Sequence, residues 1–418
     1  MQADTRWLVT GASGQLGGHV VAQLAEQRPA PAICALAGAH PVGTSVEVQR
    51  VDLADTAAVT AAVHEFRPTH VIHLGAITAA SDAWANPRRA DAVNVAGTEA
   101  LAEAAAACGA FLLYGSTDMV FDGSAAPYNE DATPAPLSVY GRTKLTAERV
   151  VRQFPRSLVV RLPLLYGFPM TTRQTTFAQQ IATLLAGQRL RLFVDEYRTP
   201  AWLPGAARAV IGLAERGAVG RLDVGGLTPT GDSSRGGLLH VAGPERLSRF
   251  ELIARCATLL GMANDQLVAT ARDDLAAPEP RPADLSLDDG RFRRQFPELA
   301  PGPLTAAVVA PAEVPTLRPV ELAEQLRGTA PPVLLDCRES SEFAAAALPG
   351  AVHIPLAELP DRRTALDPQR PLVVYCHRGV RSLRAAAYLR QVGFTQVAHL
   401  RGGIDAWSQE VDAAVPRY

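Results

Sequence analysis

The sequence lacks the features that define several classes of protein. It has only five cysteines among 418 residues, and their spacing fits neither a disulfide framework nor a zinc site. We therefore predict no metal centre and a reducing, cytoplasmic location. No apolar run approaches the ~20 residues of a membrane helix, and residues 1–6 carry no signal-peptide pattern. The formal net charge of −2 gives no electrostatic reason to bind nucleic acid or an anionic membrane, so neither is expected as a partner.

The chain does have the length and pattern of a multidomain α/β protein. With 418 residues, 48% of them hydrophobic, it is long enough for two or three domains. Predicted strands alternate with helices, which indicates a parallel sheet covered on both faces. The strands are expected at 7–9, 33–36, 46–51, 70–74, 111–115 and 158–160, and the helices include 56–66, about 88–108 and 140 to about 153.

A glycine turn follows the first predicted strand. Gly11, Gly14 and Gly17 come directly after the apolar segment 7–9, and apolar residues then recur at helical spacing. Glycines at such a turn let the backbone approach a pyrophosphate, which then lies at the N-terminus of the helix. The order of strand, glycine turn and helix therefore favours a dinucleotide site over a turn without a ligand.

Tyr140 and Lys144 are four residues apart and share one face of a predicted helix. A cation beside a phenol lowers the pKa of that phenol, which yields a proton donor usable near neutral pH. Thr117 supplies a hydroxyl near the end of the strand predicted at 111–115. Its alternative interpretation is an ordinary threonine at a strand end.

With the segments 116–123, 161–167, 195–200, 240–244 and 281–284, these motifs resemble the extended short-chain dehydrogenase/reductases. The branch is that of dTDP-4-dehydrorhamnose reductase and the methionine adenosyltransferase regulatory β-subunit. The resemblance covers about residues 1–300 and implies a Rossmann-type doubly wound parallel sheet with a small substrate subdomain, mainly 168–300. It implies that Tyr140 protonates the ketone oxygen of a sugar-nucleotide substrate, that Thr117 hydrogen-bonds this oxygen, and that Lys144 holds the nicotinamide ribose. The implied cofactor-binding residues are Gly11, Ser13, Gly14, Gln15, Leu16, Gly17, Asp52, Leu53, Leu74, Gly75, Ala76, Tyr140, Lys144 and Pro163.

Two polar residues within this part of the chain have alternative interpretations. Asp52 occupies a position where the family contacts adenine, and its alternative is a cap for the helix at 56–66. Asn94 is expected to be structural, bonding backbone groups within its own sheet-facing helix. The segment 36–40 has neither an acid for a ribose diol nor an arginine for a 2′-phosphate. Loss of the acid removes a repulsion against NADPH, so we expect NADPH slightly more than NADH.

A linker rich in proline and alanine, residues 301–315, precedes a second unit at 316–418. In this unit Cys376 directly follows a strand predicted at 372–375, in a loop that also carries Arg378 and Arg381. Loop amides and a helix beginning near Ser382 would stabilise a thiolate there. Buried packing without reactivity is expected instead for three other cysteines, Cys34, Cys108 and Cys256.

This second unit resembles the rhodanese-like sulfurtransferases in the segments 336–339, 349–355, 376–381 and 402–407. The resemblance implies a separate α/β domain, catalytic Cys376 and Arg381, and thiosulfate or a protein persulfide as sulfur donor. It also implies a sulfur-binding loop that includes His377, Arg378, Gly379 and Val380. The six-residue loop from cysteine to arginine favours sulfur over phosphate. Cys337 replaces the usual aliphatic residue, and both a packing role and a role in resolving a persulfide stay open.

The predicted function is NAD(P)H-dependent reduction of a keto sugar nucleotide, combined with sulfur transfer through a cysteine persulfide. One alternative is a nucleotide-binding regulatory subunit without turnover, similar to the adenosyltransferase β-subunit. Another makes the sulfurtransferase the principal activity, with the reductase domain supplying a substrate for thiolation. The resemblance is compatible with a homodimer.

Overall fold

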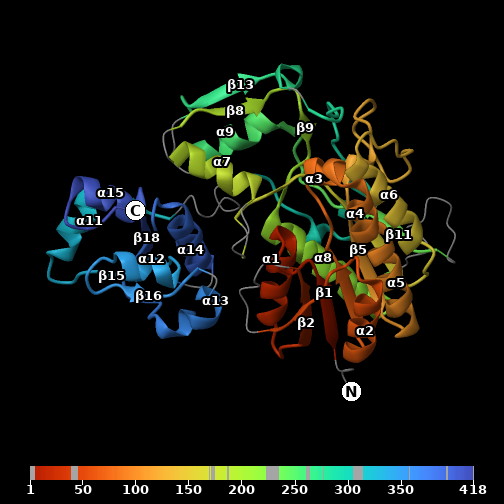
Figure 1. The fold of residues 1–418 in the computed structure, drawn as a ribbon, viewed down its shortest axis with the longest axis horizontal. Coiled ribbons are helices and arrows are strands. Elements are labelled where there is room, and N and C mark those ends of the chain that lie inside the picture. Colours follow the sequence, from red (N-terminus) through yellow and green to blue (C-terminus); the bar gives the residue numbers. More distant parts are fainter. Residues whose placement is uncertain are drawn as a thin grey trace.

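The computed structural model describes residues 5–38, 46–168, 170, 175–185, 188–222, 235–259, 264–275, 277–304, 314–356, 358–391 and 394–417. Figure 1 shows a large unit and, beside it, a smaller unit formed by the C-terminal part of the chain. Residues 39–40, which entered the cofactor argument, and the middle of the predicted linker lie outside the described residues. Within the described ranges, no helix is both long and apolar enough to cross a bilayer.

A seven-stranded parallel sheet in the order β11-β6-β5-β4-β1-β2-β3 forms the centre of the large unit. The strand order reverses direction at β1, which is the topological switch point of a doubly wound sheet. The predicted fold class is therefore confirmed. The strands are β1 (Arg6–Thr10), β2 (Ala32–Ala37), β3 (Glu47–Arg50), β4 (His70–His73), β5 (Phe111–Thr117), β6 (Ser157–Leu162) and β11 (Gly237–His240).

Helices cover both faces of this sheet because alternate strand residues point to opposite sides. Trp7 and Val9 of β1 pack in a cluster with helices α1 and α8, whereas Leu8 packs in a second cluster with α2, α5 and α6. Each cluster buries the apolar stripe of its helices against the sheet. The bounds of these helices are α1 (Gln15–Ala25), α2 (Thr56–Phe66), α5 (Gly97–Ala107), α6 (Val139–Val151) and α8 (Leu203–Ala218).

The helix predicted at about 88–108 is interrupted. After α3 (Ala80–Ala85), the chain forms α4 (Pro87–Asp91), a π-helical turn (Ala92–Ala96) and then α5. Asn94, in the π turn, accepts a hydrogen bond from the Ile77 amide at 2.8 Å and donates to the Ile77 carbonyl at 3.1 Å. Its predicted structural role is confirmed, although the backbone it binds belongs to the loop after β4.

The region 168–300, which was expected to form the substrate subdomain beside the large sheet, divides into two parts. Its α8 and β11 return to the large sheet, because the buried side of α8 packs on β4, β5 and α1. The remainder forms three two-stranded sheets with helices around them, in the upper part of Figure 1. These elements are β7 (Leu165–Tyr166), α7 (Thr176–Leu185), β8 (Leu190–Phe193), β9 (Tyr197–Arg198), β10 (Ala201–Trp202), β12 (Leu247–Ser248), α9 (Arg249–Leu259) and β13 (Leu267–Thr270). Helix α10 (Gly290–Gln295) packs on β11, and its Phe292 belongs to the core cluster of the large sheet.

The C-terminal unit has its own five-stranded parallel sheet, in the order β14-β18-β17-β15-β16. Helix α14 begins at Val380, two residues before the predicted start. The strands are β14 (Thr316–Leu317), β15 (Val333–Asp336), β16 (Val352–His353), β17 (Leu372–Tyr375) and β18 (Val397–Leu400). The helices are α11 (Pro319–Leu326), α12 (Ser340–Ala345), α13 (Leu359–Arg362), α14 (Val380–Gln391) and α15 (Gly403–Glu410).

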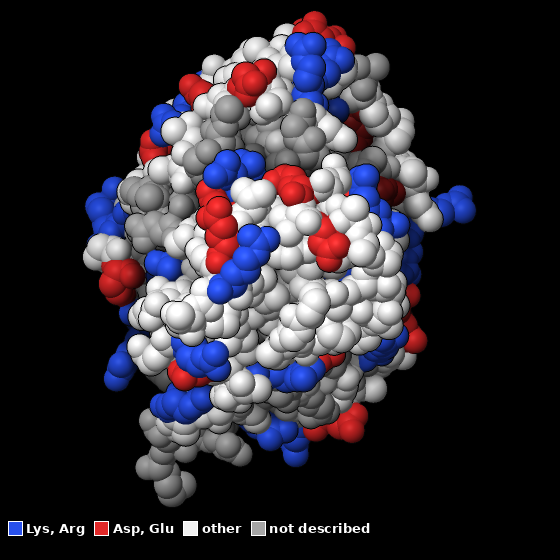
Figure 2. Space-filling model, turned by 90° about the vertical axis from the view of Figure 1, so that its left-hand side faces the viewer, with Lys and Arg blue, Asp and Glu red and all other residues white. Residues whose placement is uncertain are grey.

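The two units touch through the chain that follows β7. Phe168 and Met170 pack against the core cluster of the C-terminal unit, and the Phe168 carbonyl also lies 2.8 Å from the His19 ring Nε2 on α1. On the face of the molecule that Figure 2 presents, basic and acidic side chains are interspersed around a largely uncharged centre.

Candidate functional sites

A cavity of about 1210 Å³ lies over the carboxyl ends of the strands of the large sheet, where ligands bind in doubly wound folds. Every residue predicted for cofactor binding or catalysis in this unit contributes to its lining. These residues are Gly11, Ser13, Gly14, Gln15, Leu16, Gly17, Asp52, Leu53, Leu74, Gly75, Ala76, Thr117, Tyr140, Lys144 and Pro163.

The glycine turn packs too closely for side chains. Gly11 has a φ of +68°, and its carbonyl accepts a hydrogen bond from the Gly14 amide at 2.8 Å. A Cβ on Gly14 would come within 2.9 Å of that carbonyl oxygen, and one on Gly17 within 2.2 Å. Glycine is therefore required here for the backbone to turn directly into α1, whose N-terminal end faces the cavity.

Asp52 lies at the rim of the cavity and is not a helix cap. Arg89 Nη2 donates to both carboxylate oxygens of Asp52, at 2.7 and 2.8 Å. The Ala54 amide and this arginine hold the pKa of Asp52 below its usual value. The cap of α2 is Asp55, which accepts from the Ala58 amide at 3.0 Å, so the alternative interpretation of Asp52 was wrong.

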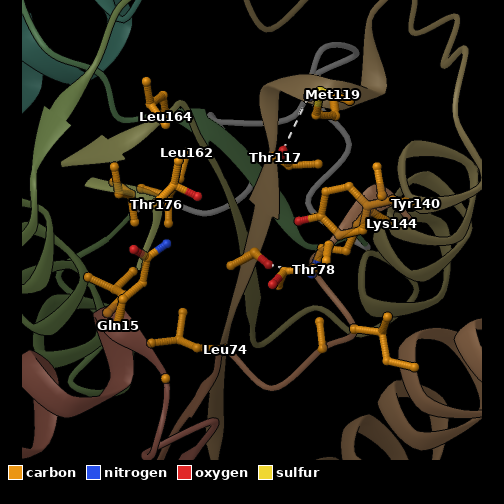
Figure 3. A pocket seen from close by; sticks show the side chains of 18 of the residues that line it. Gln15, Leu74, Thr78, Thr117, Met119, Tyr140, Lys144, Leu162, Leu164 and Thr176 are labelled. Atoms are coloured by element: carbon orange, nitrogen blue, oxygen red, sulfur yellow. Dashed lines mark hydrogen bonds between the residues drawn. The ribbon is translucent and has the colours of Figure 1, made fainter. Parts of the chain in front are cut away.

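Tyr140 and Thr117 face one another across the floor of the cavity (Figure 3). Burial raises the pKa of Tyr140, while a hydrogen bond with Thr117 opposes the change. The direction is opposite to the sequence-based expectation, because the phenol is removed from water. Thr117 Oγ1 also accepts from the Met119 amide and lies near Asp118 Oδ1, both at 3.2 Å.

Lys144 is buried behind Tyr140 and makes two contacts with strand β5. Its Nζ donates to the Gly115 carbonyl at 2.7 Å and stands 4.0 Å from the centroid of the Tyr114 ring. Burial lowers the pKa of Lys144 to about 7, although the Glu148 carboxylate opposes the change. Lys144, the cation expected to lower the pKa of Tyr140, therefore loses its own proton near neutral pH.

Beyond Thr117 the cavity is lined by paired charges. Asp118 Oδ2 lies 3.3 Å from Arg198 Nε, and Glu196 Oε1 lies 2.8 Å from Arg249 Nε. Burial raises the pKa of Asp118, and the two arginines oppose the change. Arg281 also lines this end of the cavity.

The charged residues at this end of the cavity, and Arg89 at its rim, were not predicted as site residues from the sequence. Glu196 and Arg198 lie inside the segment 195–200, which contributed to the resemblance, so a signal existed for them. Arg249 begins α9 and carries no recognisable local pattern, since only the fold brings it to Glu196.

A second site lies at the end of β17. Cys376 is buried, and the Gly379 amide donates to its Sγ at 3.1 Å. Burial would raise the pKa of Cys376, but a hydrogen bond from Cys337 and the charge of Arg381 contribute to lowering it to about 5. Arg381 is itself held by Glu342, with Nη–Oε distances of 2.5 and 2.6 Å.

The other residues of the Cys376 loop are arranged unequally around the thiol. Arg378 is exposed and His377 is partly exposed, while Gly379 is buried with a φ of +92°. Val380 begins α14. Among the cysteines expected to be buried, Cys34 and Cys256 are buried, whereas Cys108 is partly exposed beside His64.

Comparison with known proteins places both units in families. The RmlD substrate binding domain family matches residues 5–302, and the rhodanese-like domain family matches residues 319–410. The chain belongs to the RmlD substrate binding domain family. It carries a rhodanese-like domain behind its RmlD unit, as the sequence motifs predicted.

Two kinds of relative match the RmlD unit about equally well. The methionine adenosyltransferase 2 subunit beta of Xenopus tropicalis is 30% identical over 296 residues, which are 69% of this chain and 82% of the relative. The dTDP-4-dehydrorhamnose reductase of Streptomyces griseus is 34% identical over 293 residues, 69% of this chain and 87% of the relative.

Solved structures show the same fold. A hypothetical dTDP-4-dehydrorhamnose reductase from Sulfolobus tokodaii superposes with a TM-score of 0.60 at 25% identity, covering 73% of this chain and 99% of the other. The Bacillus anthracis dTDP-4-dehydrorhamnose reductase, solved in complex with NADP, gives a TM-score of 0.58 at 23% identity and covers 70% of this chain and 93% of the other.

Proposed function

We propose that the RmlD unit reduces the keto group of a sugar nucleotide with NAD(P)H. The observation that carries this proposal is the single cavity that joins the glycine turn, the facing pair Tyr140 and Thr117, and a set of arginines. A dinucleotide cofactor and a sugar-nucleotide substrate need one continuous space. The proton donor, Tyr140, must lie where the nicotinamide and the keto group meet.

The lining of the cavity fits a dinucleotide. The glycine turn lines the cavity at the N-terminal end of α1, where backbone amides can bind a pyrophosphate. When bound, the reduced nicotinamide supplies the hydride for the carbonyl carbon. Arg50 and Arg89 line the rim near Asp52, and such cations suit the 2′-phosphate of NADPH.

Three residues of the chain act on the substrate oxygen and its surroundings. Tyr140 donates its proton to the oxygen as negative charge develops there, and the Thr117 hydroxyl donates a hydrogen bond to the same atom. Because burial favours the neutral phenol, Tyr140 holds this proton until the oxygen can accept it. Lys144, with a pKa of about 7, can exchange a proton with its surroundings near neutral pH.

The charged end of the cavity supports a sugar nucleotide as substrate. Arg198, Arg249 and Arg281 line it, and guanidinium groups bind diphosphates through paired hydrogen bonds. Asp118 and Glu196 hold the first two of these arginines in place.

The test is turnover of a panel of dTDP- and UDP-4-keto sugars with NADPH and NADH. Tyr140→Phe should reduce the rate by ~10²–10⁴-fold, the usual contribution of general acid catalysis, and leave cofactor affinity unchanged. Tyr197→Phe is the matched control, because Tyr197 lies outside the cavity lining and should keep the wild-type rate.

The similarity to methionine adenosyltransferase 2 subunit beta supports a second candidate, a nucleotide-binding regulatory subunit. Binding of NADPH without turnover of any keto sugar would favour this candidate over the reductase.

We further propose that the rhodanese-like domain transfers sulfur through Cys376. Its thiolate attacks the sulfane sulfur of thiosulfate or of a protein persulfide. The bond from this sulfur to the rest of the donor breaks, so that sulfite leaves from thiosulfate or a thiol from the protein persulfide, and a persulfide remains on Cys376. Intact-mass measurement of the full chain immediately after mixing should show a gain of one sulfur atom, absent in Cys376→Ser. If the chain transfers sulfur but reduces no keto sugar, sulfur transfer is its principal activity.

A further inference from the structure

Cys337 and Cys376 follow two neighbouring parallel strands at the same level. β15 and β17 are paired up to Asp336 and Tyr375, and the Cys337 amide donates to the Tyr375 carbonyl at 3.1 Å. Adjacent strands are ~4.8 Å apart, and disulfide-bonded cysteines have Cα atoms ~4.4–6.8 Å apart. The two cysteines therefore lie within the range that a disulfide bond spans.

The two cysteines are buried inside one apolar cluster of the C-terminal unit. Cys337 is 0% exposed and Cys376 is 1% exposed. The Cys337 thiol donates to the carbonyl oxygen of Tyr375, the residue before Cys376, at 3.3 Å. Burial and the neighbouring Cys376 raise the pKa of Cys337, whereas the pKa of Cys376 is lowered to about 5. Cys376 is thus the thiolate that receives sulfur first, and Cys337 keeps its proton beside it.

We propose that Cys337 resolves the persulfide on Cys376 and releases its outer sulfur as hydrosulfide. This proposal rests on the proposed sulfur transfer to Cys376. Packing alone would require only a side chain of suitable size at this position. The structure instead places a thiol at the end of the neighbouring strand, in the same apolar cluster as the sulfur atom that carries the persulfide.

The atoms and electrons of this step balance. Cys337 Sγ attacks Cys376 Sγ, a disulfide bond forms between them, and the bond from Cys376 Sγ to the outer sulfur breaks. The proton of Cys337 goes to the departing sulfur, which leaves as HS⁻. The two cysteine sulfurs are oxidised and the sulfane sulfur is reduced. A dithiol reductant, acting on the disulfide, restores both thiols for another cycle.

A single-turnover experiment on the full chain tests the proposal. The fully reduced protein is freed of reductant and mixed with thiosulfate, and hydrosulfide and intact mass are followed together. Wild type should release up to one hydrosulfide per chain and lose two hydrogen atoms in mass. Peptide mapping should then show a Cys337–Cys376 disulfide.

Variants separate this step from the first transfer. Cys337→Ser and Cys337→Ala should retain the added sulfur on Cys376 and release no hydrosulfide above background. Cys108→Ser, which changes a partly exposed cysteine elsewhere, should behave like wild type. Retention of sulfur by either Cys337 variant also shows that its domain is folded.

Two outcomes overturn the proposal, and they are distinguishable. If wild type holds a persulfide as long-lived as that of Cys337→Ser and releases no hydrosulfide, Cys337 is a packing residue and the sulfur transfer stands. If wild type gains no sulfur from thiosulfate or a protein persulfide and releases no hydrosulfide, the proposed transfer fails together with this step.

Discussion

Glu148 and Arg161 form a bidentate ion pair that joins the helix of Tyr140 to strand β6. Arg161 Nε lies 2.9 Å from Oε1 and Nη2 lies 2.7 Å from Oε2 of Glu148, and both side chains are almost fully buried. The Ser116 hydroxyl donates to the same carboxylate at 2.5 Å. Because Ser116 precedes Thr117, the pair fixes α6 against the strand end that carries the other predicted catalytic hydroxyl.

Removing one charge of this pair should destabilise the RmlD unit. Glu148→Gln leaves the buried guanidinium without its counterion, and such losses typically cost ~3–5 kcal/mol. The free energy of unfolding, followed in urea by circular dichroism, should fall by about this amount. The control is Glu298→Gln, which breaks the more exposed pair with Arg216 and should cost at most ~1 kcal/mol. Equal effects of the two substitutions would contradict the assignment.

Adding a methyl group at Gly14 should weaken dinucleotide binding. A Cβ there lies 2.9 Å from the Gly11 carbonyl oxygen, so the turn must shift and its amides move away from the pyrophosphate. We expect Gly14→Ala to raise the Kd for NADPH by about tenfold, ~1.4 kcal/mol, in a fluorescence titration. Gly302→Ala is the control, because a Cβ at Gly302 meets no atom within 4 Å. An unchanged Kd in Gly14→Ala would place the dinucleotide elsewhere.

The thiolate of Cys376 should persist to acidic pH. Its pKa is lowered to about 5 and an unperturbed thiol titrates near ~8.5, so the thiolate should form as the pH rises through about 5. The stabilisation that this shift gives the folded domain is present above the unfolded pKa and is lost as the pH falls through 5. Thiolate absorbance, taken as the difference between wild type and Cys376→Ser, measures the midpoint.

Two substitutions in the neighbouring ion pair should move this midpoint differently. Arg381→Gln removes a cation that stabilises the thiolate, so the midpoint should rise. Glu342→Gln leaves the Arg381 charge without its carboxylate partner, and the midpoint should be no higher than in wild type. A rise in both variants would indicate disruption of the loop and would argue against the role of the Arg381 charge.

Features that depend on neighbours in sequence were predictable. The helix at 56–66 has the predicted bounds, and the glycine turn follows its strand as expected. Turn chemistry and helical periodicity act over a few residues, so the sequence carries them directly. The same holds for the placement of Cys376 at the end of β17.

Features that depend on tertiary contacts were not predictable from the sequence. Nothing near Gly237–His240 indicates that this strand joins the large sheet beside β6, because its partner lies far away in the chain. The pKa of Tyr140 moves opposite to expectation since burial, a sum over the whole fold, outweighs the hydrogen bond with Thr117. Cys337 and Cys376 are 39 positions apart in the numbering, and only the pairing of β15 with β17 brings them together.

Each unit has a reactive side chain where a parallel strand ends. Thr117 is the last residue of β5, and Cys337 and Cys376 each follow the last residue of their strand. The hydrogen bonds that align the strands are made by backbone groups, including the amide of Cys337, so the sheets do not depend on which side chains stand at these positions. The substrate preference of either unit can therefore be redesigned by exchanging the segments that follow the strands, without changing the strands of the two sheets.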